Sequence, residues 1–114
     1  MKKGKVWGTT ETVIATPFCE VHRILVEAGG HSSWHHHARK WNAFTLYSGE
    51  LRIETEDGKL VTQLDLGQGD VTSIPPGVVH RFVNVSGDEA WGLELYYPEG
   101  LSEDIIRATV GGKL

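Results

Sequence analysis

Short runs of β-branched, aromatic and aliphatic residues alternate with turn residues along most of the chain. Runs of this kind, bounded by Gly, Pro, Asn or Asp, are typical of β-strands. The pattern predicts strands over residues 12–15, 18–27, 33–37, 42–47, 50–56, 60–66, 71–74, 78–85 and 90–97. Many short strands at this spacing indicate an all-β sandwich or barrel with Greek-key connections, of the jelly-roll type.

The turn residues between these runs support the strand boundaries. Asp57-Gly58 predicts a tight hairpin, because both residues tolerate the positive φ of a type I′ turn. Pro75-Pro76-Gly77 predicts a rigid turn, because the two prolines exclude a central strand at these positions. Only residues 102–109 have a helical pattern, in which Ser102 is the N-cap and Gly111-Gly112 ends the helix.

Composition places the chain in an ordinary class. Its 114 residues suit one domain, spanning residues 1–114, and show no linker or repeat. The net charge of -4, with both signs interspersed, argues against a nucleic-acid-binding surface. Cys19 is the single cysteine, so no internal disulfide forms. With no signal-peptide pattern and no apolar stretch of roughly 20 residues, we expect a cytoplasmic protein without a membrane partner.

Three histidines carry the clearest chemistry. His35 and His37 are two residues apart in a segment predicted to be extended, so they project to one side while His36 projects to the other. His80 follows the rigid turn at residues 75–77. Imidazoles bind Zn, Cu, Ni and Fe, and complete Mn sites. Residue type alone is equally consistent with histidines of the surface or the core.

The spacing around these histidines resembles that of the cupins. The first cupin motif, G-x5-H-x-H-x3-4-E-x6-G, is matched in spacing by Gly29, His35, His37, Asn42 and Gly49. The second, G-x5-P-x-G-x2-H-x3-N, is matched by Gly69, Pro75, Gly77, His80 and Asn84. The resemblance spans about residues 29–84. It implies a cupin double-stranded β-helix, a jelly-roll barrel, with one divalent ion (Zn, Fe, Ni or Mn) held in its mouth by His35, His37 and His80.

Asn42 departs from the resemblance, because the cupin motif has glutamate there. An amide oxygen is neutral and is a weaker metal ligand than a carboxylate. Two outcomes follow. Either the three histidines hold the ion and Asn42 is a loose fourth ligand or orients water, or the site no longer binds metal. The retention of all three histidines favours the first outcome.

Strand alternation gives candidates for the rest of the site. Phe44 and Leu46 share a face with Asn42, and Phe82 shares a face with His80, so these three could contact a substrate or form the core. Trp41 borders the histidine segment and is a further substrate-binding candidate. Glu94, on the last predicted strand, is the inward carboxylate best suited to acid–base catalysis. Arg52 and Arg81 fall on outward positions.

The function is narrowed by a finer resemblance. Residues 101–107 and 79–84 look like parts of the cupin domain in type II phosphomannose isomerases. This implies a sugar or sugar-phosphate isomerase or epimerase acting on a small molecule, although no lysine or arginine cluster for a phosphate is evident. A three-histidine Fe(II) dioxygenase and a non-catalytic carbohydrate- or ligand-binding module are the alternatives. Similar cupins pair through N-terminal strands, so we expect a homodimer formed by the residues before Thr12.

Overall fold

The computed structural model describes residues 2–98 and 106–114. Within these residues the chain forms nine β-strands and no helix. The strands are β1 (Lys2–Lys5), β2 (Gly8–Ala15), β3 (Glu20–Val26), β4 (Trp41–Ser48), β5 (Leu51–Asp57), β6 (Leu60–Leu66), β7 (Val71–Ile74), β8 (Val79–Val83) and β9 (Ala90–Tyr97). All paired strands run antiparallel. The all-β prediction is confirmed.

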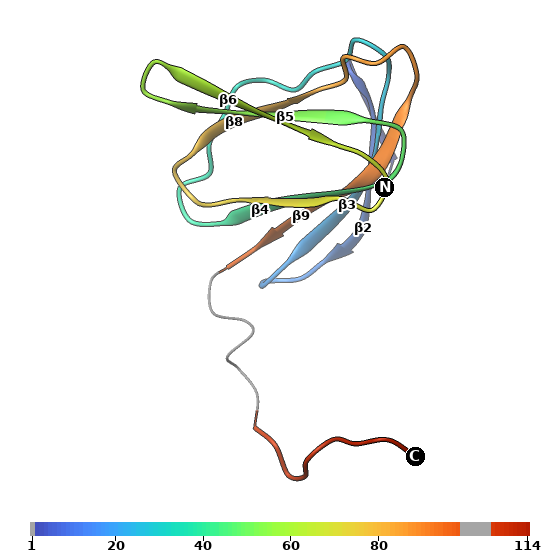
Figure 1. The fold of residues 1–114 in the computed structure, drawn as a ribbon, viewed down its shortest axis with the longest axis vertical. Helices are drawn as coiled ribbons and strands as arrows, with labels where there is room; N and C mark the ends of the chain where they lie inside the picture. The colour runs from blue at the N-terminus through green and yellow to red at the C-terminus, as the bar shows by residue number, and fades with distance from the viewer. Residues whose placement is uncertain (1, 99–105) are drawn as a thin grey trace.

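Two sheets face each other around one core (Figure 1). The larger sheet has the order β1-β2-β3-β9-β4-β7, and the smaller has the order β6-β5-β8. The last strand, β9, lies between β3 and β4, so strands far apart in sequence become neighbours. This arrangement is the predicted jelly-roll barrel.

The core lies between the inward faces of the two sheets. Phe82 on β8 packs edge-on against Phe44 on β4 and against Trp7, with ring centroids 5.9 and 4.8 Å apart. The other members are aliphatic and come from both sheets: Ile24, Val26, Leu46, Leu51, Ile53, Leu66, Ile74 and Ala90. Burial of this apolar surface is the main favourable contribution to folding.

Most predicted strands are present, and three of them (60–66, 71–74 and 90–97) have the predicted bounds. Residues 33–37 are an exception, since they form no strand. They lie in a loop that touches the edge of β8 through isolated bridges, His31 with Val83 and His35 with His80. The sequence also did not predict β1, whose three lysines and one glycine have low strand propensity.

The predicted C-terminal helix over 102–109 falls partly on residues 99–105, outside the described part of the chain. The described remainder, residues 106–109, is not helical, so the prediction is wrong there. Ile106 is 99% exposed and packs no apolar face against the barrel. A helix this short is marginal without such packing. The described residues also contain no helix long and apolar enough to span a membrane.

Asn84 explains the last position of the second motif. Its side chain is fully buried, and its Nδ2 donates to the carbonyl oxygens of Val26 (3.0 Å) and Asp88 (2.7 Å). Its Oδ1 accepts from the backbone N–H of Ser86 (3.0 Å) and from the Ser86 hydroxyl. One amide therefore ties β8 to β3 and closes the turn that leads into β9.

We predict that Asn84→Leu lowers the free energy of unfolding by about 3 kcal/mol, because a similar volume remains but buried polar groups lose their partners. Urea denaturation monitored by tryptophan fluorescence measures the change. Gln68→Leu, at an exposed turn, is the control and should stay within about 0.5 kcal/mol of the wild type. Equal stability of the two variants would contradict this role of Asn84.

Candidate metal centre

A pair of backbone hydrogen bonds places the first histidine beside the third. The N–H of His35 donates to the carbonyl of His80 (3.0 Å), and the N–H of His80 donates to the carbonyl of His35 (2.8 Å). The N–H of Gly77 donates to the carbonyl of His37 (2.8 Å), which ties His37 to the rigid turn before β8. Gly77 has a φ of +85°, a conformation that favours glycine.

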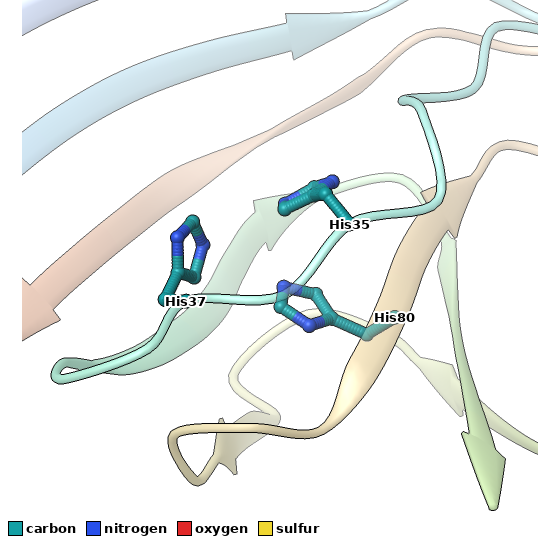
Figure 2. Close-up of side chains that lie close together, drawn as sticks. All are labelled: His35, His37 and His80. Atoms are coloured by element: carbon teal, nitrogen blue, oxygen red, sulfur yellow. The ribbon is translucent and has the colours of Figure 1, made fainter.

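The three side chains converge on one point (Figure 2). One nitrogen from each ring lies within 4.8 Å of the other two. The ring centroids are 4.5 Å apart for His35 and His80, 5.1 Å for His35 and His37, and 5.5 Å for His37 and His80. His36 is exposed to solvent, as the alternation predicts.

Backbone carbonyls fix which nitrogens face the centre. Nδ1 of His35 lies 2.8 Å from the carbonyl of Ser33, and Nδ1 of His80 lies 2.8 Å from the carbonyl of Val78. A proton on each Nδ1 leaves the Nε2 lone pair free, which is the arrangement of most metal-binding histidines. Nε2 of His37 is buried and has no hydrogen-bond partner within residues 2–98 and 106–114.

The local environment favours the neutral form of the His37 and His80 rings. Burial, followed by the charges of Lys40, His35 and His80, lowers the pKa of His37 to about 4. Burial also lowers the pKa of His80. Neutral imidazole is the form that binds metal, so these lone pairs are available at neutral pH.

Asn42 on β4 places an amide oxygen next to the Nε2 of His80. Its Nδ2 donates to the carbonyl of Leu95 (3.1 Å) and to Glu94 Oε2 (3.4 Å), which directs Oδ1 toward His80. Oδ1 lies 2.9 Å from Nε2 of His80. With the His80 proton on Nδ1, two lone pairs face each other there, an arrangement that a cation between them would relieve. The donor set therefore fits a divalent ion on three imidazoles, with an amide oxygen beside it.

Glu94 lies beside this cluster on β9. Burial raises its pKa, while hydrogen bonds with Tyr96 and Asn42 act in the opposite direction. Burial and the neighbouring Glu94 raise the pKa of the Tyr96 hydroxyl well above its ordinary value. The Tyr96 ring packs edge-on against His37, with centroids 5.1 Å apart. A carboxyl whose pKa is raised by burial thus adjoins the candidate metal centre.

A pocket of about 350 Å³ opens beside His35. Glu94 and Tyr96 line it together with His35, and Phe82 contributes an apolar wall. This combination of apolar wall and a few polar groups is typical of a small-molecule site.

Comparison with known proteins agrees with this geometry. The pattern of the family described as "Cupin domain" matches residues 22–96, more than half of the chain. The chain belongs to the cupin family. A search of the curated proteins finds no significant match for this cupin.

Solved structures share the fold at low sequence identity. CapF, a capsular polysaccharide assembling protein from Staphylococcus aureus, matches with a TM-score of 0.79 and 17% identity, over 91% of this chain and 32% of CapF. KdgF from Halomonas sp. matches with a TM-score of 0.74 and 18% identity, over 90% of each chain. A Klebsiella pneumoniae protein with a double-stranded β-helix domain matches at 0.71 and 23%, over 84% and 81%. This cupin thus spans about a third of CapF. At these identities the likeness shows the fold alone.

The predicted substrate contacts lie in different surroundings. Phe44 and Leu46 belong to the core and do not line the pocket beside His35, whereas Phe82 does both. Trp41 lies on the opposite face of β4 from Asn42 and stacks on Tyr97, with centroids 6.3 Å apart and planes 12° apart. A substrate contact by any of these four residues, like catalysis by Glu94, stays a prediction.

Sequence reasoning missed residues that the fold brings into this pocket, namely Lys3 and Lys5 of β1 and His22 of β3. The i, i+2 spacing of the lysines was the available signal, because it places both on one face of a strand. This spacing did not identify the two lysines as pocket residues, because no strand was predicted over residues 2–5.

We predict that untagged protein reconstituted with Zn²⁺, Mn²⁺ or Fe²⁺ binds about one ion per chain, and that His80→Ala lowers the affinity at least about 100-fold by removing one of three ligands. Metal analysis after dialysis and titration with a competing chelator measure this. His36→Ala, the exposed neighbour of the ligands, is the matched control and should bind as the wild type does. Full occupancy in His80→Ala would refute the ligand set.

Proposed function

We propose that this cupin holds one divalent ion on His35, His37 and His80 and moves a proton on a small carbonyl compound, as a sugar isomerase or epimerase does. The observation that carries the proposal is the position of Glu94. Its carboxyl contacts Asn42, which in turn lies 2.9 Å from the Nε2 of His80. His35 and Glu94 line one pocket, which supports the pairing of a metal ligand with a proton carrier.

The chemistry follows from the two groups. Three neutral ligands leave the ion its full positive charge, so it would act as a Lewis acid on a substrate oxygen. In an isomerisation, Glu94 would take a proton from the hydroxyl-bearing carbon beside the carbonyl and return it to the former carbonyl carbon, while the hydroxyl proton moves to the carbonyl oxygen. Burial raises its pKa, which favours a role as a proton carrier. Asn42 orients this carboxyl through its Nδ2, and Tyr96 holds it by a hydrogen bond.

Several features support a polyhydroxylated substrate. Hydroxyl groups of Thr10, Thr12, Ser32 and Ser33 line the pocket and can exchange hydrogen bonds with sugar hydroxyls. The indole of Trp7 lies in the same lining and offers an apolar ring. CapF, a structural neighbour, is a capsular polysaccharide assembling protein.

A three-histidine Fe(II) dioxygenase is the second candidate. The observation that favours it is the donor set itself, which has a neutral amide where most cupins have a carboxylate. Glu94 weighs against it, because a carboxyl beside the candidate metal centre suits proton transfer.

Exchange with solvent deuterium tests the proposed reaction. Metal-loaded protein is incubated in D₂O with aldoses, ketoses, their phosphates and uronates, and the loss of the C–H signal beside the carbonyl is followed by proton NMR. We predict exchange on at least one of these compounds, slowed about 100-fold or more by Glu94→Gln. Glu50→Gln, which changes an exposed carboxylate, is the control.

The outcomes separate the candidates. Glu94→Gln should retain its metal, because the carboxyl lies outside the three-histidine set. Exchange that survives in Glu94→Gln would refute the catalytic assignment. Stoichiometric iron with oxygen uptake and no exchange would instead establish the dioxygenase. Sugar binding without exchange or oxygen uptake would establish a binding module.

A further inference from the structure

The first strand presents two lysines to the pocket. Lys3 pairs with Thr10 and Lys5 with Gly8 in the β1–β2 hairpin. Lys3, Lys5 and Thr10 all line the pocket that holds His35 and Glu94. Lys2, one residue earlier, falls on the opposite face, pairs with Glu11 and is not part of the lining.

The hairpin that carries these lysines is held against the barrel. The carbonyl of Trp7, at the turn between β1 and β2, accepts a hydrogen bond from the N–H of Glu27 (2.9 Å). The Trp7 ring packs edge-on against Phe82 of the core. Gly8, the first residue of β2, fits where any Cβ would lie 1.9 Å from the carbonyl oxygen of Leu25. The hairpin that carries Lys3 and Lys5 is therefore fixed to the barrel by these contacts.

Lys3 and Lys5 form no ion pair with any residue in the described ranges 2–98 and 106–114. Glu94, the carboxylate of the lining, hydrogen-bonds to Asn42 and Tyr96. Arg52 and Arg81 pair instead with Asp65 and Glu54. The pocket thus has unbalanced positive charge at one end, to which a bound divalent ion would add.

We infer that the substrate of this pocket is an anionic polyhydroxylated compound, a sugar acid or a sugar phosphate, whose carboxylate or phosphate binds Lys3 and Lys5. This inference rests on the proposed function, because it assigns the metal to the other end of the same substrate. β1 is the third neighbour of β9 in the sheet order, about 14 Å away at the usual strand spacing. Lys3 and Lys5 share the pocket lining with His35, so one small substrate could contact both the lysines and an ion held by the histidines.

Charge complementarity accounts for both affinity and selectivity. An ammonium group makes charge-assisted hydrogen bonds to carboxylate or phosphate oxygens, which are about twice as strong as neutral ones. A concave pocket of one sign also concentrates ions of the opposite sign. A neutral sugar would leave two ammonium groups without partners, so the lysines favour the acid over the neutral sugar.

Calorimetric titration of metal-loaded protein with glucose, glucuronate and glucose 6-phosphate tests the inference. We expect at least one anion to bind about tenfold or more tightly than glucose, as the loss of one charge-assisted contact predicts. Lys3→Met/Lys5→Met should abolish this preference while leaving the metal content unchanged. Lys2→Met, on the opposite face of the same strand, should retain it. The anion that binds more tightly identifies carboxylate or phosphate as the recognised group.

Equal affinity for the three probes, or no binding of either anion, would overturn the inference and leave the proposed function intact if deuterium exchange occurs. A preference that persists in Lys3→Met/Lys5→Met would also overturn it. If the protein takes up no metal, the proposed function fails. The same titration on metal-free protein then still tests the lysines, since anion binding lost in the double variant supports them alone.

Discussion

The reciprocal pair of backbone hydrogen bonds between His35 and His80 is the constraint on which the candidate site depends. It joins a loop that forms no strand to the edge of β8 at a single residue pair. Because residues opposite each other in such a pair project to the same side, the two imidazoles meet. His37, two residues further along, then reaches the same point. One bridge therefore aligns the histidines as a continuous strand would. Other residues of the loop, Ser32 and Ser33, line the pocket.

Asn42 changes how charge is distributed around this bridge. Because position 42 carries an amide, the candidate ligands among the described residues include no carboxylate. The carboxylate of Glu94 lies on β9, the strand next to Asn42 on β4. The amide connects the two, since its oxygen faces His80 and its nitrogen faces Glu94. The carboxyl of Glu94 thus lies near the candidate metal centre but outside the three-histidine set.

Local sequence signals predicted the strands, the hairpin turn and the spacing of the histidines, which depend on residues close together in the sequence. The Asp57-Gly58 turn and period-two alternation gave β5 and β6 nearly to the residue, and the motif spacing identified the three histidines. The pocket wall could not be predicted in this way. Lys3 lines the same pocket as Glu94 only because β9 inserts beside β3, where His22 pairs with Glu94, about seventy positions further along the chain. The helical pattern over 102–109 failed in its described part because it had no apolar surface to pack against.

The β1–β2 hairpin separates selectivity from stability. β1 is an edge strand, all of its residues are exposed, and none belongs to the hydrophobic core. Substitutions at its two inward positions therefore alter the chemistry of the pocket at little cost to folding, while the histidines and core residues stay constrained. Related chains can diverge in ligand preference through this one hairpin, which makes it a natural starting point for redesigning specificity on an unchanged barrel.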